Sequence, residues 1–157
     1  MQVPKKYIAV WQETGGQAGS SGRAHGSVRE AADAIEEHMV KRGVEPQEAA
    51  RFTYRLSGCR VGAICPAPSG EVSYRILEAD FTSDRKAIVP GLRVTDHDRQ
   101  PGTVTADQFM QDIYGYPGGE YFDNWYYVTR DGEDRAYRRF NGERMESLYE
   151  KKETGRC

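Results

Sequence analysis

The stretch "VPGLRVTDHDRQPGTVT", residues 89–105, decides how the second half of the chain folds. Two short runs rich in β-branched residues enclose the polar segment Asp96-His97-Asp98. The pattern predicts two strands joined by a turn, in which the carboxylates accept hydrogen bonds from backbone N–H groups. A metal site would need further ligands, and no second cluster in the sequence has ligand spacing. We therefore interpret Asp-His-Asp as a turn and expect no metal.

The pattern of short strands and turns continues beyond this stretch. "NWYYVTRDG" and "EDRAYRRFNG" predict two more strands, and Asp131-Gly132 between them predicts a tight hairpin, because such turns need positive φ. Together these segments resemble small SH3-like β-barrels of the KOW-related kind over about residues 88–148. The resemblance is carried by Gly91, Arg93, Val94, Gly102, Thr103, Val104, Val128, Asp131, Gly132, Phe140, Gly142, Arg144 and Met145. It implies a fold but no particular function, since such barrels bind many things.

One long insertion departs from the SH3-like pattern. Residues 106–124, "ADQFMQDIYGYPGGEYFDN", separate the second and third predicted strands, and long loops are often functional. Tyrosine with nearby glycine is common at recognition surfaces, and turn residues here prevent every ring from being buried. The alternative, a loop folded back over the barrel, stays open. We predict a partner-binding surface formed by Tyr114, Tyr116, Tyr121, Phe122, Trp125, Arg138 and Arg139.

The first part of the chain, residues 1–87, predicts one good amphipathic helix among strands. Ser27 and Glu30 form a capping box, and apolar residues then recur at helical spacing until Gly43. The predicted elements are a strand over 5–12, a glycine-rich loop over 13–26, the helix over 28–42, one helical turn over 45–50 and strands over 51–58, 59–70 and 71–81. We therefore expect an α+β protein: a β-α-β-β-β layer with its helix on an antiparallel sheet, then the SH3-like part over 88–157, packed either separately or as one unit.

Composition limits the setting of the protein. The chain has 157 residues and a net charge of −2, which argues against indiscriminate binding to nucleic acid. The longest apolar stretch is too short to cross a bilayer, and the start "MQVPKKYIAVW" does not resemble a signal peptide, so we expect a cytoplasmic protein without a membrane partner. Cys59, Cys65 and Cys157 are then reduced thiols, and without a Cys-x-x-Cys pair we interpret the first two as packing residues.

The sequence contains no pair of carboxylates at telling spacing, no nucleophile motif and no cofactor loop. We therefore predict a non-catalytic binding protein without a cofactor, which docks on a protein or nucleoprotein through the aromatic insertion. An accessory protein of a phage or plasmid that inhibits host machinery would fit. One alternative is a nucleic-acid-binding protein that uses the same arginine and aromatic surface. A second alternative is an enzyme of unrecognised type, with a site between the two parts.

Overall fold

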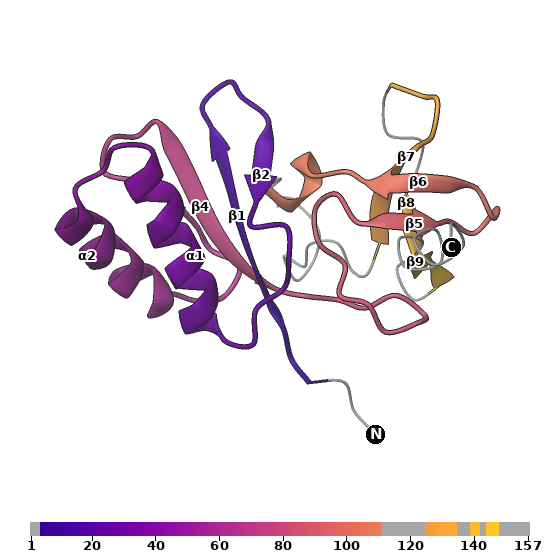
Figure 1. Ribbon diagram of the computed structural model, residues 1–157, viewed down its shortest axis with the longest axis horizontal. Coiled ribbons are helices and arrows are strands. Elements are labelled where there is room, and N and C mark those ends of the chain that lie inside the picture. The colour runs from indigo at the N-terminus through magenta and orange to yellow at the C-terminus, as the bar shows by residue number, and fades with distance from the viewer. Residues whose placement is uncertain (1–3, 111–124, 135–138, 142–143, 148–157) are drawn as a thin grey trace, which may run out of the picture. The chain divides into compact units, whose positions relative to one another are not determined.

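The chain forms two compact units, Met1–Ala79 and Asp80–Cys157 (Figure 1). Within this computed structural model, residues 4–110, 125–134, 139–141 and 144–147 are described. The boundary between the units lies upstream of the one expected after residue 87. Each unit holds an antiparallel sheet and the first also holds α-helices, so the fold is α+β, as predicted. Across the described ranges, no helix has the length and apolar character needed to span a membrane.

The sheet of the first unit has the strand order β2-β1-β4-β3. Its strands are β1 (Tyr7–Glu13), β2 (Ala18–Ser20), β3 (Ile64–Pro66) and β4 (Val72–Glu78). The central strands β1 and β4 pair along their whole length, from Tyr7↔Glu78 to Glu13↔Val72. The strands predicted near residues 5–12 and 71–81 are thus confirmed. The short strands β2 and β3 form the two edges of this sheet.

Helix α1 (Val28–Lys41) confirms the helix predicted over 28–42. The Ser27 hydroxyl caps it by accepting a hydrogen bond from the Glu30 N–H at 3.1 Å. One face of the helix, including Ile35 and Met39, is buried in a core with residues of the sheet. In Figure 1, α1 lies against the sheet and α2 runs beside α1.

Helix α2 (Pro46–Ser57) corrects the strand predicted over 51–58 and the expectation of a single helix. The alternation of Phe52, Tyr54 and Leu56 suggested one buried strand face, but Tyr54 is 73% exposed. The buried residues are instead Ala49, Phe52, Thr53 and Leu56, which have the spacing of one helix face. Pro46 is compatible with the start of this helix, because the N–H groups of the first turn have no partner within the helix. The predicted helical turn over 45–50 is therefore the first part of a longer helix.

Strand β2 corrects the expectation that residues 13–26 form only a loop. It pairs with β1 from Val10↔Ser20 to Gln12↔Ala18. The strand itself, Ala18–Ser20, contains no β-branched residue, so no pattern in the sequence indicates it. Position 19 requires glycine, because the Cβ of any other residue would lie 2.7 Å from Nε1 of Trp11. The glycine therefore allows the Trp11 indole to lie against the backbone of β2.

The second unit contains a five-stranded antiparallel sheet of order β8-β7-β6-β5-β9. Its elements are β5 (Arg93–Thr95), β6 (Pro101–Val104), the short 3₁₀ helix η1 (Asp107–Met110), β7 (Trp125–Arg130), β8 (Arg139–Asn141) and β9 (Glu146–Ser147). The last strand returns to pair with β5, at Val94↔Ser147 and Thr95↔Glu146. Over the residues that the structure describes, the strands form an open sheet, and the expected closed barrel is not seen.

Two aromatic side chains, Phe109 and Tyr126, belong to the core of the second unit. Phe109 and Tyr126 are buried, with ring centroids 5.7 Å apart, so these rings of the aromatic-rich region are core residues. The Tyr126 hydroxyl donates to Oδ2 of Asp80 at 2.7 Å. Burial, together with this carboxylate, raises the pKa of Tyr126 well above its ordinary value. Tyr126 is therefore a neutral hydrogen-bond donor at physiological pH.

Candidate functional site

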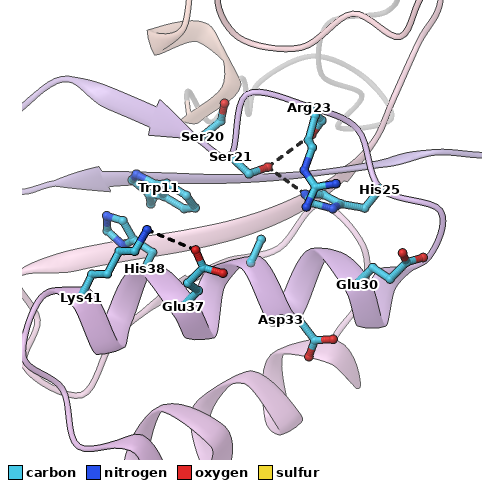
Figure 2. Close-up of a pocket in the computed structure, with 11 residues that line it drawn as sticks. Trp11, Ser20, Ser21, Arg23, His25, Glu30, Asp33, Glu37, His38 and Lys41 are labelled. Carbon is cyan, nitrogen blue, oxygen red and sulfur yellow. Dashed lines mark hydrogen bonds and ion pairs between the residues drawn. The ribbon is translucent and has the colours of Figure 1, made fainter.

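A groove in the first unit runs between the β1–β2 hairpin, the loop that follows β2, and helix α1 (Figure 2). Its volume is about 530 Å³. The lining residues are Trp11, Ser20, Ser21, Arg23, His25, Glu30, Asp33, Ala34, Glu37, His38 and Lys41. Most of these side chains are polar or charged, in contrast to the mainly apolar pockets that enclose small ligands.

Trp11 and His38 form an aromatic platform at one end of the groove, next to Lys41 (Figure 2). Their rings stack with centroids 4.0 Å apart and an interplanar angle of 20°. Nδ1 of His38 is hydrogen-bonded to the Tyr74 hydroxyl at 2.8 Å, which fixes the imidazole from the core side. Burial, and then the charge of Arg42, lowers the pKa of His38, whereas burial raises the pKa of Tyr74 to about 12. The platform is therefore uncharged at neutral pH.

Ser21 and His25 lie at the other end of the groove, in the loop between β2 and α1 (Figure 2). The Ser21 hydroxyl and Nε2 of His25 are 2.8 Å apart. His25 also pairs with Tyr7 through two backbone hydrogen bonds of 2.7 and 2.8 Å, so the loop is tied to the start of β1. Burial, and then the charge of Arg23, lowers the pKa of His25. A neutral imidazole beside a hydroxyl is an arrangement that can accept the hydroxyl proton.

Acidic side chains of α1 form one wall of the groove. Glu30, Asp33 and Glu37 are three and four residues apart, a spacing that places them along one helix face. Asp33 pairs with Arg29 at 3.3 Å and Glu37 with Lys41 at 3.2 Å. All four side chains in these pairs are at least 58% exposed, so the pairs are weak and can give way to another cation.

The Asp96-His97-Asp98 segment is confirmed as a turn between β5 and β6. Oδ1 of Asp96 accepts the backbone N–H groups of Asp98 at 2.9 Å and Gln100 at 3.1 Å. Arg130 binds Asp96 at 2.8 Å and Asp98 at 2.7 Å. The two carboxylates are thus engaged in hydrogen bonds to the backbone of the turn and in ion pairs with Arg130. Among the described residues, no group of three or more His, Cys, Asp or Glu is placed to hold a metal ion.

The binding surface predicted from the sequence falls on a part of the chain that the structure does not describe. Tyr114, Tyr116, Tyr121, Phe122 and Arg138 lie outside the described residues. Trp125 and Arg139 contribute their backbones to β7 and β8, but their side chains lie outside the description as well. That surface therefore remains a prediction.

Sequence reasoning missed the groove because its walls come from separated segments. In the sequence His25 lies in a glycine-rich segment and His38 in the predicted helix, and nothing in their spacing joins them to Trp11. The available signals were the helical spacing of Glu30, Asp33 and Glu37 and the glycine at position 19. No family model matches the chain, and neither the curated proteins nor the solved structures contain a match to it.

Proposed function

We propose that this protein is a non-catalytic binding protein, and that the groove beside α1 takes an extended, basic segment of a protein or nucleoprotein partner. The observation that carries the proposal is the Trp11–His38 stack in an open, polar groove with an acidic wall. A flat, uncharged aromatic surface offers contact area at low entropic cost. The exposed carboxylates of the wall complement lysine or arginine side chains.

Charge favours a protein segment over a nucleic acid. The lining of the groove holds three carboxylates, Glu30, Asp33 and Glu37, against two cations, Arg23 and Lys41, so its net negative charge disfavours phosphates. In the second unit, Arg93 is paired with both carboxylate oxygens of Asp131, at 2.6 and 2.7 Å, and Arg130 is paired with Asp96. These guanidinium groups already have anionic partners. Nucleic-acid binding through the predicted arginine and aromatic surface remains the alternative, and it would show a steep loss of affinity with salt.

The second unit is proposed to be an SH3-like module that carries the aromatic insertion as a second contact surface. Its strand order supports this proposal, because β5 to β8 are successive neighbours and β9 returns to β5, the connectivity that a small barrel requires. Gly102 also supports it: a Cβ there would lie 2.6 Å from Cγ1 of Val128, so the glycine is needed where β6 meets β7. The proposed contact residues are those predicted from the sequence.

Charge reversal in the groove tests the proposal. The Asp33→Lys variant is expected to lower the affinity for a captured partner about tenfold, because it places a like charge against a basic segment. Glu48→Lys, on the exposed surface of α2, is the matched control and should bind normally. Affinity capture from the native host, followed by titration of the purified partner, gives the measurement. Equal affinities for both variants would reject the groove as the docking site.

The aromatic insertion needs its own variant. Replacing Tyr114, Tyr116 and Tyr121 together with Ala should weaken partner capture while the far-UV circular dichroism stays native. Tyr54→Ala is a suitable control, since this ring is 73% exposed on α2 and outside the groove. Unfolding of the triple variant would show that the rings are core residues. Native circular dichroism with unchanged capture would reject the insertion as a contact surface.

One observation favours a second candidate, a hydrolase that uses Ser21 as nucleophile. Ser21 and His25 have the contact that a nucleophile and its base need, at 2.8 Å. However, no hydrogen bond within the described part of the chain joins His25 to a carboxylate that would orient its ring. A fluorophosphonate probe tests this candidate directly. Labelling that is lost in both Ser21→Ala and His25→Gln would support an enzyme, and a lack of labelling in the wild type would exclude this mechanism.

A further inference from the structure

Two cysteines of the first unit meet at the β3 edge of its sheet. Cys59 follows the C-cap Gly58 of helix α2 and is exposed. Cys65 lies in β3, opposite Tyr74 of β4, and is half-buried against the core on the helix side of the sheet. Although a helix end and a strand carry these residues, both side chains line one hollow, and Cys59 is near enough to raise the pKa of the Cys65 thiol. Packing alone, the role expected from the sequence, does not require this proximity.

The surroundings of the two thiols form a small apolar hollow of about 370 Å³. It is lined by Phe52, Leu56, Pro66 and Pro68 together with Arg55 and both cysteines. Sγ of Cys59 lies 3.3 Å from the Arg55 carbonyl oxygen, which anchors the exposed sulfur at the end of α2. The hollow leaves room beside the pair for the aliphatic part of a small thiol compound. Its lining is separate from that of the groove beside α1.

We propose that Cys59 and Cys65 are a reversible dithiol–disulfide site that reacts with low-molecular-weight disulfides such as glutathione disulfide. The proposal rests on two thiols that line one hollow, one open to solvent and the other half-buried. It is independent of the proposed binding function, because none of these residues lines the groove.

The two steps of the exchange assign different roles to the cysteines. The thiolate of Cys59 attacks one sulfur of glutathione disulfide; the S–S bond of the reagent breaks and glutathione leaves as a thiolate, which takes a proton. Cys65 then loses its proton to water, and its thiolate attacks Sγ of Cys59 in the mixed disulfide. The Cys59–Cys65 bond closes as the second glutathione leaves as a thiolate, which takes a proton. In total two protein thiols are oxidised, and one glutathione disulfide is reduced to two glutathione molecules.

Access and protonation both support this order. Cys59 is exposed and can meet the reagent, whereas Cys65 is half-buried. Burial, and then the neighbouring Cys59, raises the pKa of the Cys65 thiol, so Cys65 stays protonated during the first step. Once Cys59 carries glutathione, the adjacent Cys65 attacks within the same molecule, at a high effective concentration.

The test uses the full chain with the third thiol removed, as Cys157→Ser. The folded protein is equilibrated in buffers of increasing glutathione disulfide to glutathione ratio, quenched with acid, alkylated and mapped by non-reducing peptide mass spectrometry. Both thiols should be lost together, and a peptide pair linked through Cys59 and Cys65 should replace the free peptides. Reduction with dithiothreitol should restore both thiols.

Single substitutions separate the two roles. With Cys65→Ser added, the reaction should stop at a glutathione adduct on Cys59. With Cys59→Ser added, the remaining thiol should react at least about tenfold more slowly, because it is half-buried and protonated. Far-UV circular dichroism checks that each variant is folded. If a second substitution unfolds the chain, peptide mapping of the Cys157→Ser protein still shows whether Cys59 and Cys65 become linked.

Three results would overturn the proposal. The first is separate glutathione adducts on Cys59 and Cys65 without a link between them. The second is no reaction of the folded chain at any buffer ratio, with linkage only after urea is added. The third is preferential linkage of either cysteine to Cys157 in the unmodified protein.

Discussion

Asp96 and Asp131 each pair with an arginine in the second unit, but their environments differ. The Asp96 side chain is 0% exposed and that of Arg130 is 14% exposed, whereas the Asp131 and Arg93 side chains are 45% and 31% exposed. Removing one partner of a buried pair leaves an uncompensated charge, which costs about 3–5 kcal/mol, whereas an exposed pair contributes about 1 kcal/mol or less. The carboxylate of Asp96, in the turn that the sequence predicts, therefore forms the more strongly stabilising of the two ion pairs.

Asparagine substitutions at these two positions give the first prediction. Asp96→Asn should lower the free energy of unfolding of the second sheet by about 2 kcal/mol, because Arg130 loses its buried partner and keeps only the exposed carboxylate of Asp98. Asp131→Asn keeps a residue that suits a turn and should cost at most about 1 kcal/mol. Hydrogen exchange of the β5 and β6 amides measures both effects within this unit. Equal losses in the two variants would contradict the argument from burial.

His38 gives a second prediction at the same scale, with a sign fixed by its surroundings. Because burial and Arg42 lower its pKa, the folded state holds His38 neutral, and stability is lost as the pH falls below 6.5. A charged imidazole stacked on an indole quenches its emission, so the fluorescence of Trp11 should fall with a midpoint below pH 6.5. The titration is made in a Trp125→Phe background and should vanish in His38→Gln. A midpoint above pH 6.5 would contradict the buried stack.

A helix or strand could be predicted where the apolar residues of one continuous segment are also the residues that become buried. Helix α1 was predicted because its capping box and apolar spacing lie in one continuous segment. Helix α2 was not, because Phe52, Tyr54 and Leu56 alternate like a strand, and only packing shows that Tyr54 points to solvent. Strand β2 depends on Trp11 lying over Gly19, a contact between segments that no local pattern reveals. The groove could not be predicted for the same reason.

Strand β9, which pairs with β5, is also held by the carboxylate of Asp84. Asp84 accepts hydrogen bonds from the Ser147 hydroxyl at 2.5 Å, the Thr82 hydroxyl at 2.6 Å and the Ser147 N–H at 3.0 Å. Burial alone would raise the pKa of Asp84, but the hydrogen bonds from Ser147 and Thr82 outweigh it and lower the pKa from 3.8. The charged carboxylate therefore fastens β9 to the rest of the unit.

The third prediction is acid-induced release of β9. Because the folded pKa of Asp84 is lowered, its contribution to stability is complete above the unfolded pKa of 3.8 and is lost as the pH falls through the lower folded value. Protection of the Ser147 amide from hydrogen exchange, corrected for the intrinsic rate, should fall over this range. In Asp84→Asn, protection should already be low at neutral pH and should not depend on pH. A pH-dependent loss that persists in this variant would assign the effect to another group.

At the scale of the whole molecule, each unit has a core of its own. In the first, Ile35, Phe52 and Tyr74 belong to one cluster that joins both helices to the sheet. In the second, Val94, Val104 and Val128 are fully buried in neighbouring strands of the other sheet. The sequence pattern predicts two parts that divide after residue 87 but leaves open whether they pack separately or as one unit. The boundary at Ala79 follows from where β4 ends, which the periodicity did not locate.

Two substitutions, one in each unit, test whether these cores are separate cooperative units. Phe52→Ala should destabilise the first unit by about 4 kcal/mol, because it removes a large ring that packs against Tyr74 with centroids 5.7 Å apart. Gly102→Val should destabilise the second unit, because a Cβ at this position would lie 2.7 Å from the Thr129 carbonyl oxygen as well as against Val128. Hydrogen exchange read by mass spectrometry resolves the two units in the intact chain. Each variant should raise exchange in its own sheet and leave the amides of the other sheet protected. If either substitution releases both sheets together, the chain unfolds as one unit and its two cores are thermodynamically coupled.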